Sequence, residues 1–485
     1  MDKSHLSSKQ SHCKISMIDK FAYGIGNFST GTSMQVISVF LVFYCINILN
    51  ISGSFVGIAT SAGIVWDAVT DPLMGYISDC TRLKKLGRRH LYILIGSIGL
   101  ALSNFLLWSI SPNWTGKTKI LILFICLFAI KTFSTIYVTP YTALGAELTN
   151  DYNERTSIQS IKTIFFLAGL AFATVAVLAL FFKPTAEYPM GQKNPAAYPV
   201  MGFYTSLIIL ILALVCFFVT KKYIPILNEN IEEKPAEFKL SSMFHSFLEV
   251  LKNKNFKAVG FPYMFSNLVT ALITGLGMTV FTDVFLLTSG EISLILAVLL
   301  GFSVISQPFW TMTSKKLDKK PALKQSIVLC IIASCLLVLL VIFKNSVKGN
   351  APIFFPFAAL AGFGIGGLMS LPLSMIADII DTEEFDTGVR SEGTYYGCLT
   401  LLYKLGQSIA MLLVGNVLHL LDTTKISPNT NEYILGFILS IGSILFFILA
   451  IISLMSYNLS KEKIAEVQNE IAKKGHVNRK KDSAV

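Results

Sequence analysis

The sequence predicts an all-α membrane protein whose twelve transmembrane helices form two six-helix halves. The 485 residues are 53% hydrophobic and only 14% charged, whereas soluble domains average about 25% charged residues. Mean hydropathy is +0.62. Apolar runs of roughly 20 residues or more, enough to cross about 30 Å of hydrocarbon, recur along the chain. One long polar connection separates the sixth run from the seventh.

The apolar runs define the predicted helices in order. They span 21–49, 54–78, 90–111, 118–149, 156–182, 200–220, 258–285, 290–313, 322–343, 352–380, 392–420 and 432–458. Five segments follow: an N-terminal segment 1–20, an N-terminal half 21–220, a central loop 221–257, a C-terminal half 258–458 and a basic tail 459–485. A weak internal repeat supports two halves, because Asp71-Pro72 in the second span is echoed by Gln307-Pro308 in the eighth.

The basic residues predict the orientation. If the N-terminus is cytoplasmic, most of the 40 lysines and arginines fall in cytoplasmic segments, as the positive-inside rule requires. When Lys119 and Lys324 at helix ends are counted with their adjoining loops, only Lys131, Lys162 and Lys404 lie within predicted helices. We therefore expect a multi-pass plasma-membrane protein with both termini in the cytoplasm, most consistent with a bacterial inner membrane. The net charge of +11 is then a topology signal, and nucleic acid is not an expected partner.

The sequence gives no sign of catalysis or of a bound cofactor. No HExxH, GxSxG or P-loop pattern occurs. The eight cysteines form no CxxC pair, so neither a disulfide framework nor a structural metal site is expected. We expect a chain without cofactors that functions as a monomer among membrane lipids.

Two aspartates within the second span are the most informative feature. Asp67 and Asp71 are four residues apart, so both carboxylates lie on one face of a helix. Each ionised carboxylate near a bilayer centre costs roughly 3 kcal/mol on insertion scales, so the pair indicates a bound cation or a polar pocket that offsets this penalty. The alternative is a salt bridge that fixes the second helix to a neighbour.

Several longer motifs resemble one family of transporters. They are Trp66 to Gly75, Gly87-Arg88-Arg89, Pro140-Tyr141 with Asp151 to Ser157, Ala377 to Asp381, Arg390 to Gly397 and Lys404 to Gln407. Together they resemble the glycoside-pentoside-hexuronide:cation symporters, whose best-known member is melibiose permease. The resemblance runs from about Lys20 to the twelfth helix. It implies the major facilitator fold and cation-coupled symport of a sugar or sugar-derived solute by alternating access around a midplane site.

Within that resemblance, the second helix supplies the cation site. Asp67 and Asp71 match the family's Na⁺, Li⁺ or H⁺ ligands, Thr135 matches a hydroxyl that completes the site, and Thr70 replaces an asparagine. Oxygen ligands suit a hard cation such as Na⁺. Lys131 lies one turn before Thr135 and is the alternative internal cation, which would give proton coupling or cation-independent transport. A further alternative is that its stem extends toward the external surface.

The substrate residues depart from the galactoside pattern. The family's two sugar-binding acids are replaced by Gly31 and Val138, whereas cations remain at Lys162 and Lys404. This favours an anionic or zwitterionic solute such as a hexuronide, a sulfonated sugar or a lysophospholipid headgroup. The alternative is that both lysines are structural partners of the acid pair. Four further positions are expected to contact the solute through hydrogen bonds or ring stacking: Asn27, Thr30, Tyr141 and Tyr396.

The loop after the second helix resembles the family's gating loop. Asp79, Arg88 and Arg89 are expected to pair in one state and separate in the other. A non-transporting sensor or scaffold on the same fold is a weaker alternative, because such a protein has no need for the buried charges.

Overall fold

The structure is a computed structural model, and it describes residues 15–81, 83, 85–149, 152–229, 247–387, 392–423, 427–468 and 470. No strand occurs among them. Much of the predicted N-terminal segment, of the central loop and of the basic tail lies outside this part of the chain. Within it, eleven helical segments are long and apolar enough to cross a membrane. With α2 (Gly53–Cys80), which carries the acid pair, the predicted twelve spans are present.

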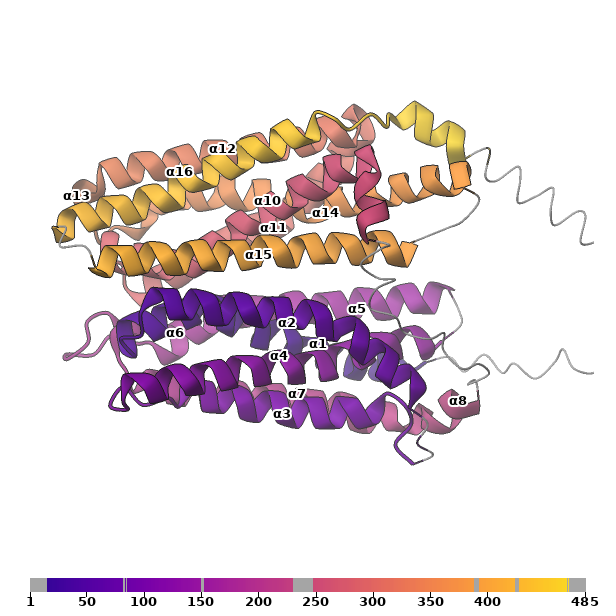
Figure 1. Ribbon diagram of the computed structural model, residues 1–485, viewed down its shortest axis with the longest axis horizontal. Helices are drawn as coiled ribbons and strands as arrows, with labels where there is room; N and C mark the ends of the chain where they lie inside the picture. The colour runs from indigo at the N-terminus through magenta and orange to yellow at the C-terminus, as the bar shows by residue number, and fades with distance from the viewer. Residues whose placement is uncertain are drawn as a thin grey trace, which may run out of the picture. The chain divides into compact units, whose positions relative to one another are not determined.

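Contacts divide the chain into two units (Figure 1). The first contains 1–51, 66–183 and 191–238, and the second contains 52–65, 184–190 and 239–485. Helix α2 therefore contributes its first half to the second unit and its second half to the first unit. The acid pair begins one residue after this division, which falls between Val65 and Trp66.

The first unit is a bundle of long helices. Its main members are α1 (Met17–Phe43), α3 (His90–Trp108), α4 (Gly116–Glu147), α5 (Tyr152–Ala171) and α7 (Ala197–Thr220). Helix α1 packs against α5 and α7, and α3 packs against α4 and α7. The α1–α5 contact is close because a Cβ on Gly31 would lie 2.4 Å from the carbonyl oxygen of Phe166. Small residues allow such approach between membrane helices.

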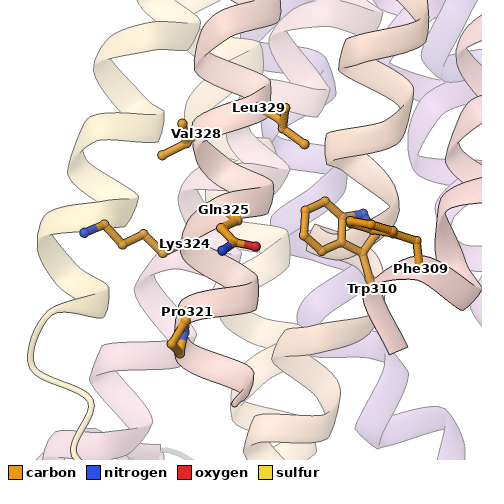
Figure 2. Close-up of a pocket in the computed structure, with 7 residues that line it drawn as sticks. All are labelled: Phe309, Trp310, Pro321, Lys324, Gln325, Val328 and Leu329. Carbon is orange, nitrogen blue, oxygen red and sulfur yellow. The ribbon is translucent and has the colours of Figure 1, made fainter. Parts of the chain in front are cut away.

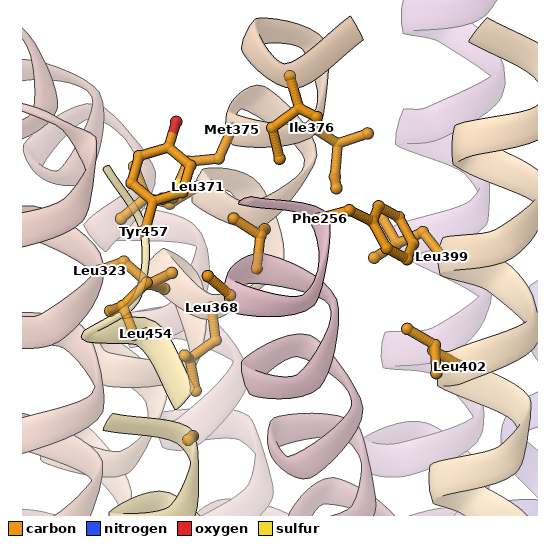
Figure 3. Packing of buried hydrophobic residues seen from close by; sticks show 14 of the residues in the cluster. Phe256, Leu323, Leu368, Leu371, Met375, Ile376, Leu399, Leu402, Leu454 and Tyr457 are labelled. Carbon is orange, nitrogen blue, oxygen red and sulfur yellow. The ribbon is translucent and has the colours of Figure 1, made fainter. Parts of the chain in front are cut away.

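The second unit contains six long helices. They are α10 (Lys254–Thr279), α11 (Ser289–Leu317), α12 (Lys319–Ile342), α14 (Phe355–Thr387), α15 (Glu392–Thr423) and α16 (Pro428–Leu454). Helix α14 packs on α11 and α12, and α10 packs on α15 and α16. Buried side chains from these helices form a core around Phe256, Leu371, Met375 and Leu399 (Figure 3). This core lies next to the residue pair Lys319–Asp378 described below.

Local sequence explains where helices begin. Ser16 caps α1, Thr115 caps α4, and Thr288 forms a capping box with Glu291 at the start of α11, so that backbone N–H groups left free at each helix start are satisfied. The observed bounds differ from the predicted spans mainly at the ends. Helix α14 continues to Thr387, beyond the predicted 380, because its last turns are polar and hydropathy detects only the membrane-crossing part. Three spans also contain a π-helical turn, at Tyr44–Ile48, Phe172–Ala176 and Val280–Val284.

Candidate functional site

The acid pair of α2 meets one hydroxyl of α4. Thr135 Oγ1 lies 2.7 Å from Asp71 Oδ1 and 3.0 Å from Asp67 Oδ1, and the Thr135 residue is only 3% exposed. Thr70, on α2 between the two acids, has its hydroxyl 3.4 Å from that of Thr135 and donates to the Trp66 carbonyl at 3.0 Å. The four predicted cation-site residues therefore converge within the first unit.

A proton count shows what this group of oxygens requires. A threonine hydroxyl has a single proton to donate, yet Thr135 Oγ1 is within hydrogen-bond distance of two carboxylates. One contact can be a hydrogen bond donated by Thr135, whereas the other brings two oxygen atoms together without a proton from Thr135. A proton on one carboxyl group or a cation between the oxygens would remove that repulsion. Among the described residues no group of three or more His, Cys, Asp or Glu side chains could hold a metal ion.

Lys131 reaches the same group. Its Nζ lies 3.8 Å from Asp67 Oδ2, and the two side chains are 29% and 18% exposed. Trp66 lies beside the pair and donates from Nε1 to Thr132 Oγ1 at 3.0 Å. Lys131 therefore points toward the acid pair and not away from it. This contact with Asp67 favours the alternative in which the Lys131 ammonium acts as an internal cation.

Residues predicted to bind substrate gather around Lys162 in the first unit. Lys162 Nζ, on α5, donates to Thr142 Oγ1 at 3.0 Å and lies 5.3 Å from the centre of the Tyr141 ring. Asn27, on α1, donates its amide to the Lys162 carbonyl at 3.1 Å. Tyr141 is fully buried and donates its hydroxyl to the Tyr23 carbonyl at 2.8 Å. Its ring stacks on those of Tyr23 and Tyr137 at 4.7 and 5.6 Å between ring centres, so in this structure neither its ring face nor its hydroxyl is exposed for the predicted stacking on a solute.

Thr30 differs from its neighbours on α1. Its Oγ1 is buried and makes no hydrogen bond to the described residues, and a buried hydroxyl without a partner is costly. The remaining two predicted substrate residues belong to the second unit, on α15. There Lys404 is 8% exposed, and Tyr396 is 36% exposed and donates to the Leu373 carbonyl at 3.2 Å.

The predicted gating residues form a compact ionic group in the first unit. Arg89 contacts Asp79 and the Ser78 hydroxyl, and it lies 2.6 Å from Glu147 Oε1. Arg88 also pairs with Glu147, at 2.9 Å. Glu147 stands at the end of α4 and was not predicted from the sequence. Its only signal was a single acid at the polar end of an apolar helix.

The second unit has a comparable ion pair that sequence reasoning also missed. Lys319 Nζ lies 2.6 Å from Asp378 Oδ2. Lys319 begins α12 directly after the α11–α12 turn, and Asp378 is 4% exposed on α14. The pair ties this turn to α14. The Asp378 position lay within one of the family motifs, but its lysine partner follows from tertiary packing alone.

The all-helical fold with a polar, charged site inside the first unit is that of a membrane transporter. A solved nucleoside transporter, NupG, has a similar fold, with a TM-score of 0.62 at 16% identity over 92% of this chain and 100% of that chain. At this identity the likeness concerns the fold alone. The family model described as "MFS/sugar transport protein" matches residues 22–461. The chain belongs to this family.

Curated relatives agree with the family. The inner membrane symporter YicJ of Escherichia coli is 24% identical, over 94% of this chain and 95% of its own length. The isoprimeverose transporter of Lactiplantibacillus pentosus is 23% identical, over 82% of this chain and 79% of its own length. The expected major facilitator fold and symporter family are thereby confirmed.

Proposed function

We propose that the chain is a cation-coupled symporter of a sugar-derived solute, with the coupling ion bound at Asp67, Asp71, Thr70 and Thr135. The family makes it a solute symporter, and its relatives include a transporter named for isoprimeverose. The observation that carries the proposal is the short contact of one hydroxyl, Thr135, with both carboxylates. A proton on one carboxyl group or a cation shared by these oxygens would stabilise that arrangement, and Na⁺, Li⁺ and H⁺ all suit oxygen ligands.

The solute is proposed to be anionic or zwitterionic. The backbone carbonyl of Lys162 accepts a hydrogen bond from Asn27 on α1, and the Lys162 ammonium donates to the Thr142 hydroxyl. Thr30 Oγ1, buried without a partner in the described residues, is available to a ligand hydroxyl. Lys404 and Tyr396, on α15 of the second unit, are also proposed as substrate-binding residues. A lysophospholipid is the second solute class to be tested, because its zwitterionic headgroup presents the same charges.

A second mechanism has a specific observation in its favour. Lys131 Nζ contacts Asp67 at 3.8 Å, so its ammonium is proposed as an internal cation that makes transport proton-coupled or cation-independent. We further propose a bacterial inner membrane, cytoplasmic termini, function as a monomer, and transport without catalysis or a resident cofactor. The group formed by Asp79, Arg88, Arg89 and Glu147 is proposed to close the cytoplasmic side.

The test is uptake by the purified chain in proteoliposomes. Neutral sugars, uronides, sulfonated sugars and lysophospholipids are screened under imposed Na⁺ or H⁺ gradients. Once a solute is found, the Asp67→Asn/Asp71→Asn variant should abolish ion stimulation. Thr135→Val should weaken the ion's apparent affinity by about 10-fold or more, because a hydrogen bond to a charged group contributes roughly 1.5–3 kcal/mol.

Thr139→Val is the matched control, since Thr139 is one turn further along α4 and makes no recorded hydrogen bond to the acid pair. Ion-stimulated uptake that survives in the double aspartate variant would refute the coupling site. Uptake that is unaffected by either gradient in the wild type would favour the Lys131 mechanism.

A further inference from the structure

A groove on the second unit lies outside all the sites described so far. It has a volume of about 530 Å³ and is lined by α11 and α12 residues Phe309, Trp310, Pro321, Lys324, Gln325, Val328 and Leu329. That volume is within the range of roughly 300–1,000 Å³ that small-molecule sites occupy. Figure 2 shows Trp310 and Gln325 facing each other, with Lys324 on the opposite flank of α12.

The walls of the groove are apolar and exposed. Phe309 is 48% exposed and Val328 is 38% exposed, whereas Trp310 is buried and donates from Nε1 to the Phe363 carbonyl at 2.7 Å. Helix α14, which carries Phe363, therefore fixes the Trp310 ring against the groove. Exposed apolar side chains on a membrane-crossing helix are suited to contact with lipid acyl chains, so the groove could hold part of an acyl chain.

Polar groups without protein partners distinguish this groove from an ordinary lipid-facing surface. The side chains of Lys324 and Gln325 are exposed and make no recorded hydrogen bond or ion pair with the described residues. Gln325 lies six residues inside α12, which begins at Lys319, or about 9 Å along the helix axis. Gln325 thus offers, near the end of the span, an amide that has no hydrogen-bond partner among the described residues and can donate to polar lipid groups.

The basic residues near the α11–α12 turn define the charge of the missing partner. Lys316 lies seven residues after Phe309, so it is on the same face of α11, two turns closer to the turn. It is exposed and has no recorded partner among the described residues. Lys324, which lines the edge of the groove, and Lys316 thus provide two ammonium groups near the α11–α12 turn.

We propose that the groove binds one anionic glycerophospholipid. Its phosphate would contact Lys324 and Lys316, its glycerol ester groups would accept hydrogen bonds from Gln325, and one acyl chain would lie along Phe309, Val328 and Leu329 beside Trp310. Basic pockets between transmembrane helices bind anionic headgroups in this way. In the proposed orientation the turn is cytoplasmic, so the lipid comes from the cytoplasmic leaflet. The site is independent of the transported solute.

Trp310 provides a direct readout. The full chain is placed in phosphatidylcholine nanodiscs that contain a small fraction of either dibromo-phosphatidylglycerol or dibromo-phosphatidylcholine, because bromine quenches a nearby indole. The contribution of Trp310 is the difference between the wild type and Trp310→Phe. We expect the anionic lipid to quench Trp310 more strongly than the zwitterionic lipid at the same mole fraction. Equal quenching by the two headgroups would overturn the proposal.

Two variants test the headgroup contacts. Lys324→Gln should reduce the preference for the anionic lipid by about fivefold, the factor that one lysine near the membrane surface contributes. Lys315→Gln is the matched control, since Lys315 is the neighbour of Lys316 but projects about 100° around α11 from it, and it should change the preference by less than about twofold. Equal losses in both variants would mean a general attraction to basic residues and would overturn the site.

Val328→Phe tests the acyl-chain contact by filling the groove. It should reduce quenching of Trp310 by both brominated lipids, and unchanged quenching would place the chain elsewhere and refute the proposal. Native mass spectrometry of the wild type and Lys324→Gln gives a second measurement that does not require Trp310→Phe to fold. Retention of phosphatidylglycerol by the wild type and its loss from Lys324→Gln are expected, and equal retention would contradict the site.

Discussion

Replacing Lys131 by methionine should increase the apparent affinity for Na⁺ in the proposed cation site. Lys131 Nζ is 3.8 Å from Asp67 Oδ2, and an ion held by that carboxylate would lie about 2.4 Å from one of its oxygens. If the ion contacts Oδ2 itself, the ammonium is at most about 6 Å from the ion. At an effective dielectric constant of about 20, two unit positive charges at that distance repel each other by roughly 3 kcal/mol.

Solvent reduces this repulsion. The Lys131 side chain is 29% exposed, and its flexible stem can move the charge away, so roughly 1–2 kcal/mol should remain. That energy corresponds to an affinity for Na⁺ about 5- to 30-fold higher in Lys131→Met than in the wild type. Lys131→Arg keeps the positive charge and should stay close to the wild type.

The assay is the Na⁺ dependence of solute uptake in proteoliposomes, from which the half-activating Na⁺ concentration is obtained for each variant. Lys117→Met is the matched control, because Lys117 is an exposed lysine at the start of the same helix, α4. A half-activating concentration that is the same in Lys131→Met and in the wild type would refute the reasoning. So would an equal shift in Lys117→Met.

Three further predictions concern stability and are measured as melting temperatures of the purified chain in detergent. Glu147→Gln should destabilise the protein by about 2 kcal/mol or more because two arginines lose a largely buried partner. The control Glu249→Gln removes a charge from an exposed ion pair and should change the stability little. Equal effects of the two substitutions would contradict this prediction. Gly57→Ala should destabilise the protein by about 1–3 kcal/mol because the new Cβ would lie 2.7 Å from the Met411 carbonyl oxygen. Gly442 has open space around it, so the control Gly442→Ala should be neutral or stabilising. Tyr457→Phe should not destabilise, since the Tyr457 hydroxyl is buried without a hydrogen bond to the described residues. Burial, with a contribution from Asp378 and Asp318, raises the pKa of Tyr457, so the wild type should lose stability relative to this variant as the pH rises above about 10, where the unfolded tyrosine ionises. Parallel pH curves for the two proteins would contradict that assignment.

The geometry of the proposed cation site was the part most accessible from sequence. Four-residue spacing places Asp67 and Asp71 on one helix face whatever the rest of the protein does. Thr135 came from the family resemblance, and the spacing of Lys131 to Thr135 then placed the lysine one turn away. What spacing could not determine was the direction of the Lys131 stem, because a lysine can reach either the acid pair or the membrane surface. In the structure the contact of Lys131 with Asp67 gives that direction.

The charged partners near the helix ends were harder to predict. Glu147 and Lys319 lie in short polar segments where many acidic and basic residues occur, and any of them could pair. Hydropathy identifies membrane spans because desolvation of the backbone and of charged groups is expensive everywhere in the bilayer. It cannot rank ion pairs near the membrane surface, since their energies depend on distances set by the packing of whole helices.

Charge balance at the acid pair explains why Lys131 and a coupling ion are not mutually exclusive. When both are ionised, Asp67 and Asp71 carry two negative charges, and Lys131 supplies one positive charge next to Asp67. A pair neutralised by Lys131 alone therefore keeps one negative charge, and the single proton of Thr135 forms only one of the two short contacts. One monovalent ion restores neutrality with the lysine in place. Without Lys131 the two carboxylates can be neutralised by two monovalent ions, so Lys131→Met should raise the steepness of Na⁺ activation as well as the affinity. Unchanged steepness in Lys131→Met would contradict this charge balance.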